Sequence, residues 1–187
     1  MKKKITFSVL TLAVIALLIG ITIFNMRQSL NRDTGLFIAQ DIAHLATVFE
    51  NINTTAGILG FDHQKNDINF LNIKKGGFVG SELGSMNLIH PDKWEGPYEK
   101  ETPRMEEEDY MVVRTHKGYF ITPGDGVKLP NGKIIGKDII FDEGADIEAM
   151  MHDEQMLSYQ GNALAAKIKI IGKHGSAQQI IFPEESE

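Results

Sequence analysis

A run of twenty residues near the start constrains this chain more than any other feature. Ile5 to Phe24 contains no charged residue, no proline and a single glycine. A helix rises ~1.5 Å per residue, so this run would be about 30 Å long, which matches the hydrocarbon core of a bilayer. The sequence therefore predicts a transmembrane helix over 5–24, with a tethered domain behind it.

A cleaved signal peptide is the alternative interpretation of the same run. Such a peptide has a basic start, an apolar stretch of about 7 to 15 residues and a small-x-small cleavage site. Lys2–Lys4 supply the basic start, but the apolar stretch is longer and leads into Asn25–Arg27 without small residues. We therefore expect a retained anchor. Segments rich in Lys and Arg stay in the cytoplasm, so residues 1–4 are expected there and the rest of the chain outside.

Composition limits the partners of the remaining domain. The first 27 residues hold four of the 19 Lys and Arg and none of the 25 acidic residues, which leaves residues 28–187 with a formal charge of −10. An acidic surface repels nucleic-acid phosphates, so we expect no nucleic-acid partner. The chain has no cysteine, which excludes disulfides, thiolate metal sites and a cysteine nucleophile.

An amphipathic helix is predicted over 25–60. Apolar residues recur there at spacings of three, four and seven: Leu30, Phe37, Ile38, Ile42, Leu45, Val48, Phe49 and Ile52. Asp41 lies within the same stripe. Gly35 costs about 1 kcal/mol relative to Ala inside a helix, which predicts a kink or break near 32–35.

Short strands are predicted in the domain that follows, over 61–183. Glycines over 61–90 favour loops with one or two short turns or strands. Alternation at 110–114 and 119–122, around a turn at 116–118, predicts a β-hairpin. Residues 127–140 contain the turn pair Asn131-Gly132 and are predicted to form a second hairpin, or a strand with an ordered loop.

A further helix and hairpin are predicted near the C-terminus. Acidic residues at the start of 142–160 and Gly161 after it are typical of a helix. Residues 166–171 and 178–182 are predicted to pair as strands, and 184–187 form an acidic tail. The expected fold class is α+β, with a long N-terminal helix packed on a small antiparallel β-sheet and an additional C-terminal helix and hairpin.

The motif Trp94-x-Gly96-Pro97-Tyr98 narrows the choice of function. Its Gly-Pro pair favours a turn, and its two aromatic rings offer apolar faces that hold such a turn on a core, so we expect a structural role. The motif, together with one span, an amphipathic helix and a small sheet, resembles the type IV pilin-like proteins. Within them the motif resembles in particular that of the major pseudopilin of the type II secretion apparatus, in which a proline such as Pro103 follows the motif.

The resemblance implies a structural or assembly component without catalytic activity. Such a protein is anchored in the inner membrane, has its domain in the periplasm, and contacts other pilin-like subunits or an assembly platform of a type II secretion or type IV pilus-like machine. The N-terminus is atypical for that family. Lys4 stands where the family has the glycine of its peptidase site, and no acidic residue within 5–24 matches the family's glutamate. The resemblance therefore implies the family's shape rather than its assembly chemistry.

Calcium is the one cofactor that the resemblance suggests, because major pseudopilins hold it in a loop of the sheet region. The candidate ligands are Asp125, Asp138, Asp142 and Asp146, which offer the hard oxygens that calcium prefers. Their spacing does not match an EF-hand loop, and acids at 142–146 are equally typical of a helix start. Both interpretations stay open.

Catalysis has no sequence motif to support it. The six histidines are scattered and never form His-Glu-x-x-His, and no serine lies in Gly-x-Ser-x-Gly. The pairs Asp41/His44 and His152/Asp153 are expected to be surface or packing residues. The alternative to a structural component is a membrane-anchored ligand-binding or sensor domain, which a polar pocket near Trp94 and Asp125 would favour.

Overall fold

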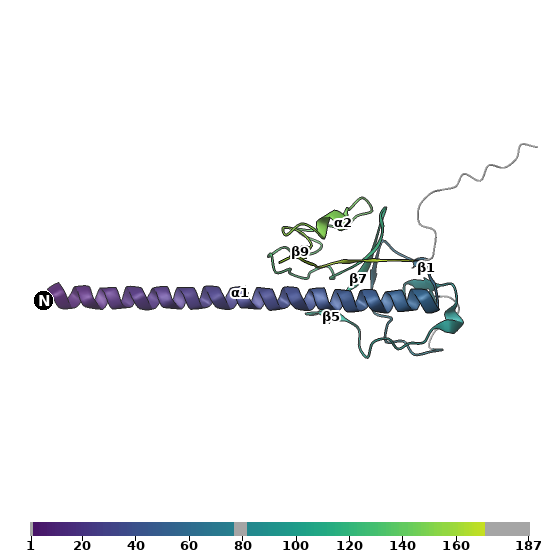
Figure 1. The fold of residues 1–187 in the computed structure, drawn as a ribbon, viewed down its shortest axis with the longest axis horizontal. Coiled ribbons are helices and arrows are strands. Elements are labelled where there is room, and N and C mark those ends of the chain that lie inside the picture. The colour runs from purple at the N-terminus through teal and green to yellow at the C-terminus, as the bar shows by residue number, and fades with distance from the viewer. Residues whose placement is uncertain (1, 77–81, 171–187) are drawn as a thin grey trace, which may run out of the picture.

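A computed structural model describes residues 2–76 and 82–170, with only the backbone described at 2–11, 27–28, 30–31 and 82–83. The described part of the chain is α+β, with helices and several small antiparallel sheets, which confirms the coarse fold class. Helix α1, Lys2–Thr55, is continuous; its first half extends away from the rest of the molecule and its second half lies along it (Figure 1). We call the part folded around this second half the head.

The break predicted near 32–35 is absent, and Gly35 instead allows close packing of the head against α1. A Cβ at Gly35 would overlap the ring of Tyr159 and would lie 3.1 Å from Cγ of Pro130. Gly35 is also the first buried position on the described part of α1. The prediction was wrong because it weighed only helix propensity, whereas here the missing side chain lets the head approach the helix backbone.

Helix α1 ends at Thr55, a few residues before the predicted boundary. Gly57 has φ +66°, a left-handed conformation that glycine adopts without steric cost. Its N–H donates to the carbonyl of Ile52 (3.2 Å), and the N–H of Ile58 donates to Oδ1 of Asn53 (3.0 Å). These bonds satisfy groups at the helix end while the chain turns into the first strand.

The main sheet has four antiparallel strands in the order β11-β8-β7-β2. Its centre is the predicted hairpin, which is confirmed as β7, Met111–Thr115, and β8, Gly118–Thr122. Strand β2, Lys65–Asp67, adds to β7, and β11, Ala166–Ile168, adds to β8. Segments separated by about a hundred residues in sequence thus form the two edges of one sheet.

Three smaller sheets complete the described strands. β1, Ile58–Phe61, pairs with β4, Met86–Leu88, which also pairs with β3, Glu82–Leu83. The other two are two-stranded: β5, Arg104–Met105, with β6, Glu108–Asp109, and β9, Ser158–Tyr159, with β10, Asn162–Ala163. A short 3₁₀-helix, η1, spans Pro91–Lys93. Within 61–90, where one or two short turns or strands are predicted, the structure has three short strands, β2, β3 and β4.

The long helix predicted over 142–160 is wrong. Only α2, Ile147–Met150, is helical there, and Ile147 is its one buried residue. The chain turns directly after α2, and the N–H of Leu157 returns to the carbonyl of Met150 (3.0 Å). This turn brings Leu157 into the core, where it is buried. A helix with one buried residue, Ile147, has too little apolar contact to be stable over a longer range.

Residues 127–140 form an ordered loop instead of a hairpin. Two isolated bridges, Lys128 with Ile134 and Ile135 with Ile139, hold it together. The expected tight turn is present, because Gly132 has φ +86° and its N–H donates to the carbonyl of Leu129. The first strand of the predicted C-terminal hairpin, 166–171, is present as β11, and it pairs with β8. Its predicted partner 178–182 and the tail 184–187 lie outside the described residues.

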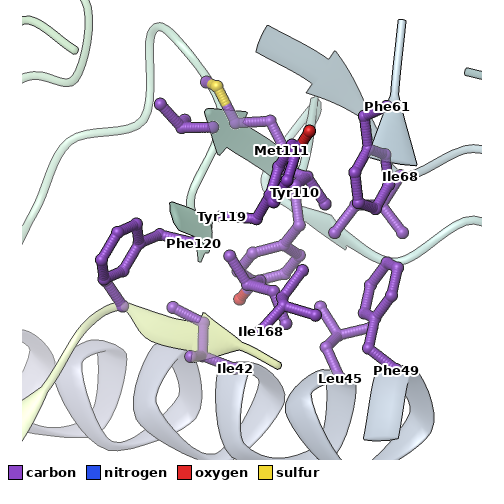
Figure 2. Close-up of a cluster of buried hydrophobic side chains, with 14 of the residues drawn as sticks. Ile42, Leu45, Phe49, Phe61, Ile68, Tyr110, Met111, Tyr119, Phe120 and Ile168 are labelled. Carbon is purple, nitrogen blue, oxygen red and sulfur yellow. The ribbon is translucent and has the colours of Figure 1, made fainter. Parts of the chain in front are cut away.

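The core joins α1 to the main sheet. One face of the helix contributes buried side chains at Ile38, Ile42, Leu45, Phe49 and Ile52. Figure 2 shows Ile42, Leu45 and Phe49 directed from the helix toward side chains of the sheet. Phe49 contacts Phe61 and Phe70 with ring centroids 6.1 and 6.2 Å apart. The periodicity of the sequence thus identified the face of α1 that the head covers.

Candidate assembly surface and ligand cavity

The first half of α1 presents apolar side chains to its surroundings. From Leu12 to Met26 the large apolar residues are between 48% and 67% exposed: Leu12, Val14, Ile15, Leu17, Leu18, Ile19, Ile21, Ile23, Phe24 and Met26. They cover the whole circumference, since consecutive residues such as Leu17, Leu18 and Ile19 are all among them. Exposed apolar surface of this extent is typical of segments that contact other apolar groups, so this segment is a candidate contact surface.

Among the residues whose placement is described, no helix is long and apolar enough to cross a membrane. The predicted span begins at Ile5, and the side chains of 5–11 lie outside the described ones. The span therefore stays a prediction.

The loop with the sequence motif is fixed on the head by its aromatic residues. Trp94 is fully buried, its Nε1 donates to the carbonyl of Ile73 (3.0 Å), and its ring contacts the ring of Tyr98 edge to face at 4.8 Å between centroids. The backbone N–H of Tyr98 donates to the carbonyl of Leu71 (2.8 Å). The peptide bond between Gly96 and Pro97 is cis.

A cavity of about 570 Å³ lies between α1 and the chain that follows this loop. Asp41, His44 and Leu45 line it from the helix, and residues 98–104 line it from the loop. Nε2 of His44 lies 2.5 Å from Oε1 of Glu99, so a polar contact ties the loop to the helix. We call this space the helix–loop cavity.

A polar pair links the head to the helix–loop cavity: the buried Tyr110 and the half-buried Asp41, which lines the cavity. The hydroxyl of Tyr110, which is fully buried, donates to Oδ2 of Asp41 on α1 (2.9 Å). Burial raises the pKa of Tyr110 far above its usual range, and the negative charge and hydrogen bond of Asp41 raise that pKa further. The phenol therefore stays neutral and acts as a donor that positions Asp41 at the cavity.

This pair predicts a pH dependence of stability. The folded state holds the phenol proton of Tyr110 more tightly than the unfolded state. The contribution of Tyr110 to the free energy of unfolding is therefore complete below the ordinary tyrosine pKa of about 10, and it declines as the pH rises above that value. Tyr110→Phe should lower the free energy of unfolding by about 1.5–3 kcal/mol at pH 7, because a hydrogen bond to a charged group is lost. Urea unfolding at pH 7 to 11 should show this difference shrinking above pH ~10. A difference that does not vary with pH would contradict the raised pKa of Tyr110 in the folded state.

The first two calcium candidates interact with other groups of the chain. Asp125 forms an ion pair with Nζ of Lys65, with both carboxylate oxygens within 2.9 Å. Oδ2 of Asp138 accepts a hydrogen bond from the N–H of Ile134 (2.9 Å). A smaller cavity of about 230 Å³ beside Asp125 is lined by both acidic and basic residues, including Lys65 and Arg104.

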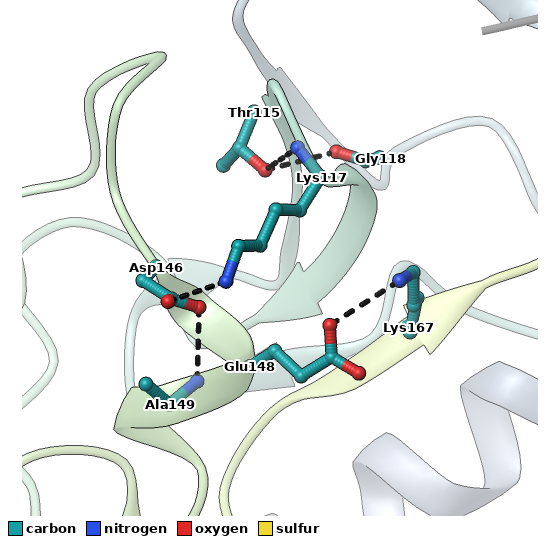
Figure 3. Close-up of polar contacts among 7 residues, drawn as sticks. All are labelled: Thr115, Lys117, Gly118, Asp146, Glu148, Ala149 and Lys167. Atoms are coloured by element: carbon teal, nitrogen blue, oxygen red, sulfur yellow. Dashed lines mark hydrogen bonds and ion pairs between the residues drawn. The ribbon is translucent and has the colours of Figure 1, made fainter. Parts of the chain in front are cut away.

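The other two candidates lie near α2. Asp146 is the N-cap of this helix and accepts from the N–H of Ala149, and it also pairs with Nζ of Lys117 (Figure 3). The hydrogen bond from Lys117, followed by that from Ala149, lowers the pKa of Asp146. Asp142 is exposed, and its main-chain carbonyl accepts from Ala145. Across 2–76 and 82–170, no three His, Asp or Glu side chains gather into a group that could hold a metal.

Sequence reasoning did not identify the helix–loop cavity. The sequence contains one indication of its helix residues. Asp41 interrupts an apolar stripe and precedes His44 by three residues, and this spacing places both on one side of a helix. Their partners Tyr110 and Glu99 lie 69 and 55 residues away in sequence, so no local pattern joins them.

In comparisons with known proteins, no protein-family model, no curated protein and no solved structure matches this chain.

Proposed function

We propose that this chain is a pilin-like, membrane-anchored structural or assembly component of a type II secretion or type IV pilus-like machine, without a catalytic role. The observation that carries the proposal is the continuity of α1: one uninterrupted helix has an apolar half that projects and a second half that the head covers. The Trp94–Tyr98 motif and the small antiparallel sheets add support, because they are the other features of the resemblance.

In this role the two halves of α1 have separate tasks. The apolar run from Ile5 to Phe24 anchors the chain in the inner membrane, where exposed Leu and Ile side chains gain by leaving water. The second half is a rigid support for the head, because its buried face is part of the core. The head then presents its surface to partner subunits at a set distance from the bilayer.

A fractionation experiment tests the anchor. The full chain, expressed in bacteria, should remain in the membrane fraction after alkaline carbonate extraction. The double variant Leu17→Arg/Leu18→Arg should move to the soluble fraction, because each arginine at the centre of a span costs about 2.5–3.5 kcal/mol. Gln40→Arg is the matched control, since Gln40 is exposed on the head-covered half of the same helix and its replacement should change nothing. Wild-type protein in the soluble fraction would contradict the anchor.

The assembly role has its own readout. In gentle detergent the wild-type chain should co-purify with pilin-like subunits or platform proteins of its host, and Gln40→Arg should as well. A chain that is well anchored but is recovered only as an isolated monomer would contradict assembly while leaving the anchor intact.

A second candidate function is a membrane-anchored ligand-binding domain. The helix–loop cavity favours it, since this cavity lies beside the aromatic motif and is lined by acidic, basic and hydroxyl side chains together with the apolar Leu45 and Pro103. Cavities of about 300–1,000 Å³ with a few polar groups are typical of small-molecule sites.

A further inference from the structure

The outer face of the β1–β4 pair carries two exposed apolar side chains. Leu59 of β1 is 57% exposed, and Ile89, which directly follows β4, is 40% exposed. Ile58 pairs with Leu88 and both are buried, so the residue after each of them points to the opposite face. Leu59 and Ile89 therefore share one face of the pair, which lies beside the C-terminal end of α1 (Figure 1).

The chain leaves the described part of the head next to this pair of strands. β11 ends at Ile168, which pairs with Tyr119 of β8. The ring of Tyr119 in turn contacts the ring of Phe61 in β1, with 5.2 Å between the centroids. The residues that follow Ile170 therefore continue from a point close to β1.

The C-terminal part of the sequence contains one apolar cluster. Ile180, Ile181 and Phe182 are consecutive, whereas the sequence around them is polar and ends in acidic residues. Apolar side chains gain free energy when they leave water for an apolar surface. Ten residues lead from Ile170 to Ile180, and such a length spans at most ~33–36 Å when extended, so the cluster can reach the face beside β1.

The other exposed large apolar residues along the head lie elsewhere. Within the described residues they are Leu36, Phe37 and Ile140. Phe37 precedes the end of α1 by 18 residues, which is about 27 Å along the helix. Ile140 stands between two buried residues, Ile139 and Phe141. In the part of the chain that the structure describes, only the face of the β1–β4 pair combines two exposed apolar side chains with closeness to the last described residue.

We propose that the C-terminal apolar cluster, residues 180–182, docks on the outer face of the β1–β4 pair and covers Leu59 and Ile89. The head is then closed by its own chain at the end opposite the N-terminal half of α1. Gly172 and Gly175 give the intervening chain the freedom to turn back toward this face. The inference goes beyond the proposed function, because it depends on neither a membrane anchor nor a partner subunit.

Disulfide trapping tests this contact, because the chain has no cysteine of its own. The full chain with Leu59→Cys/Ile181→Cys is oxidised in detergent with copper–phenanthroline, and the loss of free thiols and the mobility on non-reducing gels are followed with time. An intramolecular disulfide should form at least about tenfold faster than in the control Ile140→Cys/Ile181→Cys. Ile140 is 62% exposed, close to the value for Leu59, and both pairs share the same tether, so only docking distinguishes them.

Thermal unfolding gives a second readout that needs no oxidation. Leu59→Thr and Ile181→Ser should each lower the midpoint by about 2–4 °C, and the double variant should lower it no further than the more affected single variant. The reason is that both substitutions remove the same contact. Ile140→Thr combined with Ile181→Ser is the matched control, and its two shifts should add.

Equal rates of disulfide formation in the two double cysteine variants would overturn the inference, and so would additive shifts for Leu59→Thr and Ile181→Ser. A disulfide that forms only between two chains would also overturn it, because a second copy would then cover the face in place of residues 180–182. None of these results bears on the anchor or on assembly, which fractionation and co-purification test separately.

Discussion

Phe49→Ala should lower the free energy of unfolding by about 3–5 kcal/mol, the range for deleting a fully buried aromatic side chain. Phe49 has no exposed surface and is the helix residue that contacts Phe61 and Phe70 of the head. Its removal leaves a void at the place where α1 joins the strands, since the surrounding side chains close such a gap only in part.

The matched control for this variant lies on the same helix. Phe37 is 61% exposed, so Phe37→Ala removes the same atoms without opening a cavity and should cost less than about 1 kcal/mol. Urea unfolding of the full chain in detergent, followed by Trp94 fluorescence, measures both variants. Equal losses for the two phenylalanines would contradict the packing of α1 against the head.

Gly96→Ala should lower the free energy of unfolding by about 2–4 kcal/mol. A Cβ at Gly96 would lie 2.5 Å from the carbonyl oxygen of Ile73 and would overlap the indole of Trp94. That carbonyl accepts the hydrogen bond of Trp94, so the methyl group would separate the donor from its acceptor. The loss combines the strain of overpacking, about 1–3 kcal/mol, with the loss of a hydrogen bond, about 1 kcal/mol.

Gly144→Ala is the control for this second variant. The nearest group to a Cβ at Gly144 is Oδ1 of Asp142 at 3.5 Å, an ordinary contact, and Gly144 does not have a positive φ. Thermal unfolding should therefore show a clear fall in midpoint for Gly96→Ala and little change for Gly144→Ala. If Gly96→Ala were as stable as the wild type, the loop would not be held as described.

Local pattern was sufficient for elements whose stabilising contacts are close in sequence. The hairpin β7–β8 was predicted because its strands alternate and its turn lies between them. The buried face of α1 was predicted because every residue of Ile38, Ile42, Leu45, Phe49 and Ile52 follows helical spacing.

Local pattern failed where distant contacts outweigh propensity. Gly35 favoured a helix break by its own conformational freedom, but the approach of Tyr159, more than a hundred residues later, explains its presence. The acidic residues after 142 favoured a helix start, and Asp146 does cap α2, yet burial of Leu157 turns the chain after one turn of helix. Propensity differences of about 1 kcal/mol are small beside the burial of such side chains.

The candidate site likewise combines features that the sequence determines with features that only the tertiary structure shows. The sequence alone determined the apolar run Ile5 to Phe24, the acidic charge of the rest and the aromatic motif at 94–98, because each depends on which residues occur side by side. Only the tertiary structure decided that α1 continues without a break, that the side chains of Asp125, Asp138 and Asp146 make other contacts, and that Asp41, Tyr98 and Glu99 line one cavity. The reason is physical: periodicity reports which face of an element is buried, whereas the partner of that face is chosen by packing between residues that no local pattern connects.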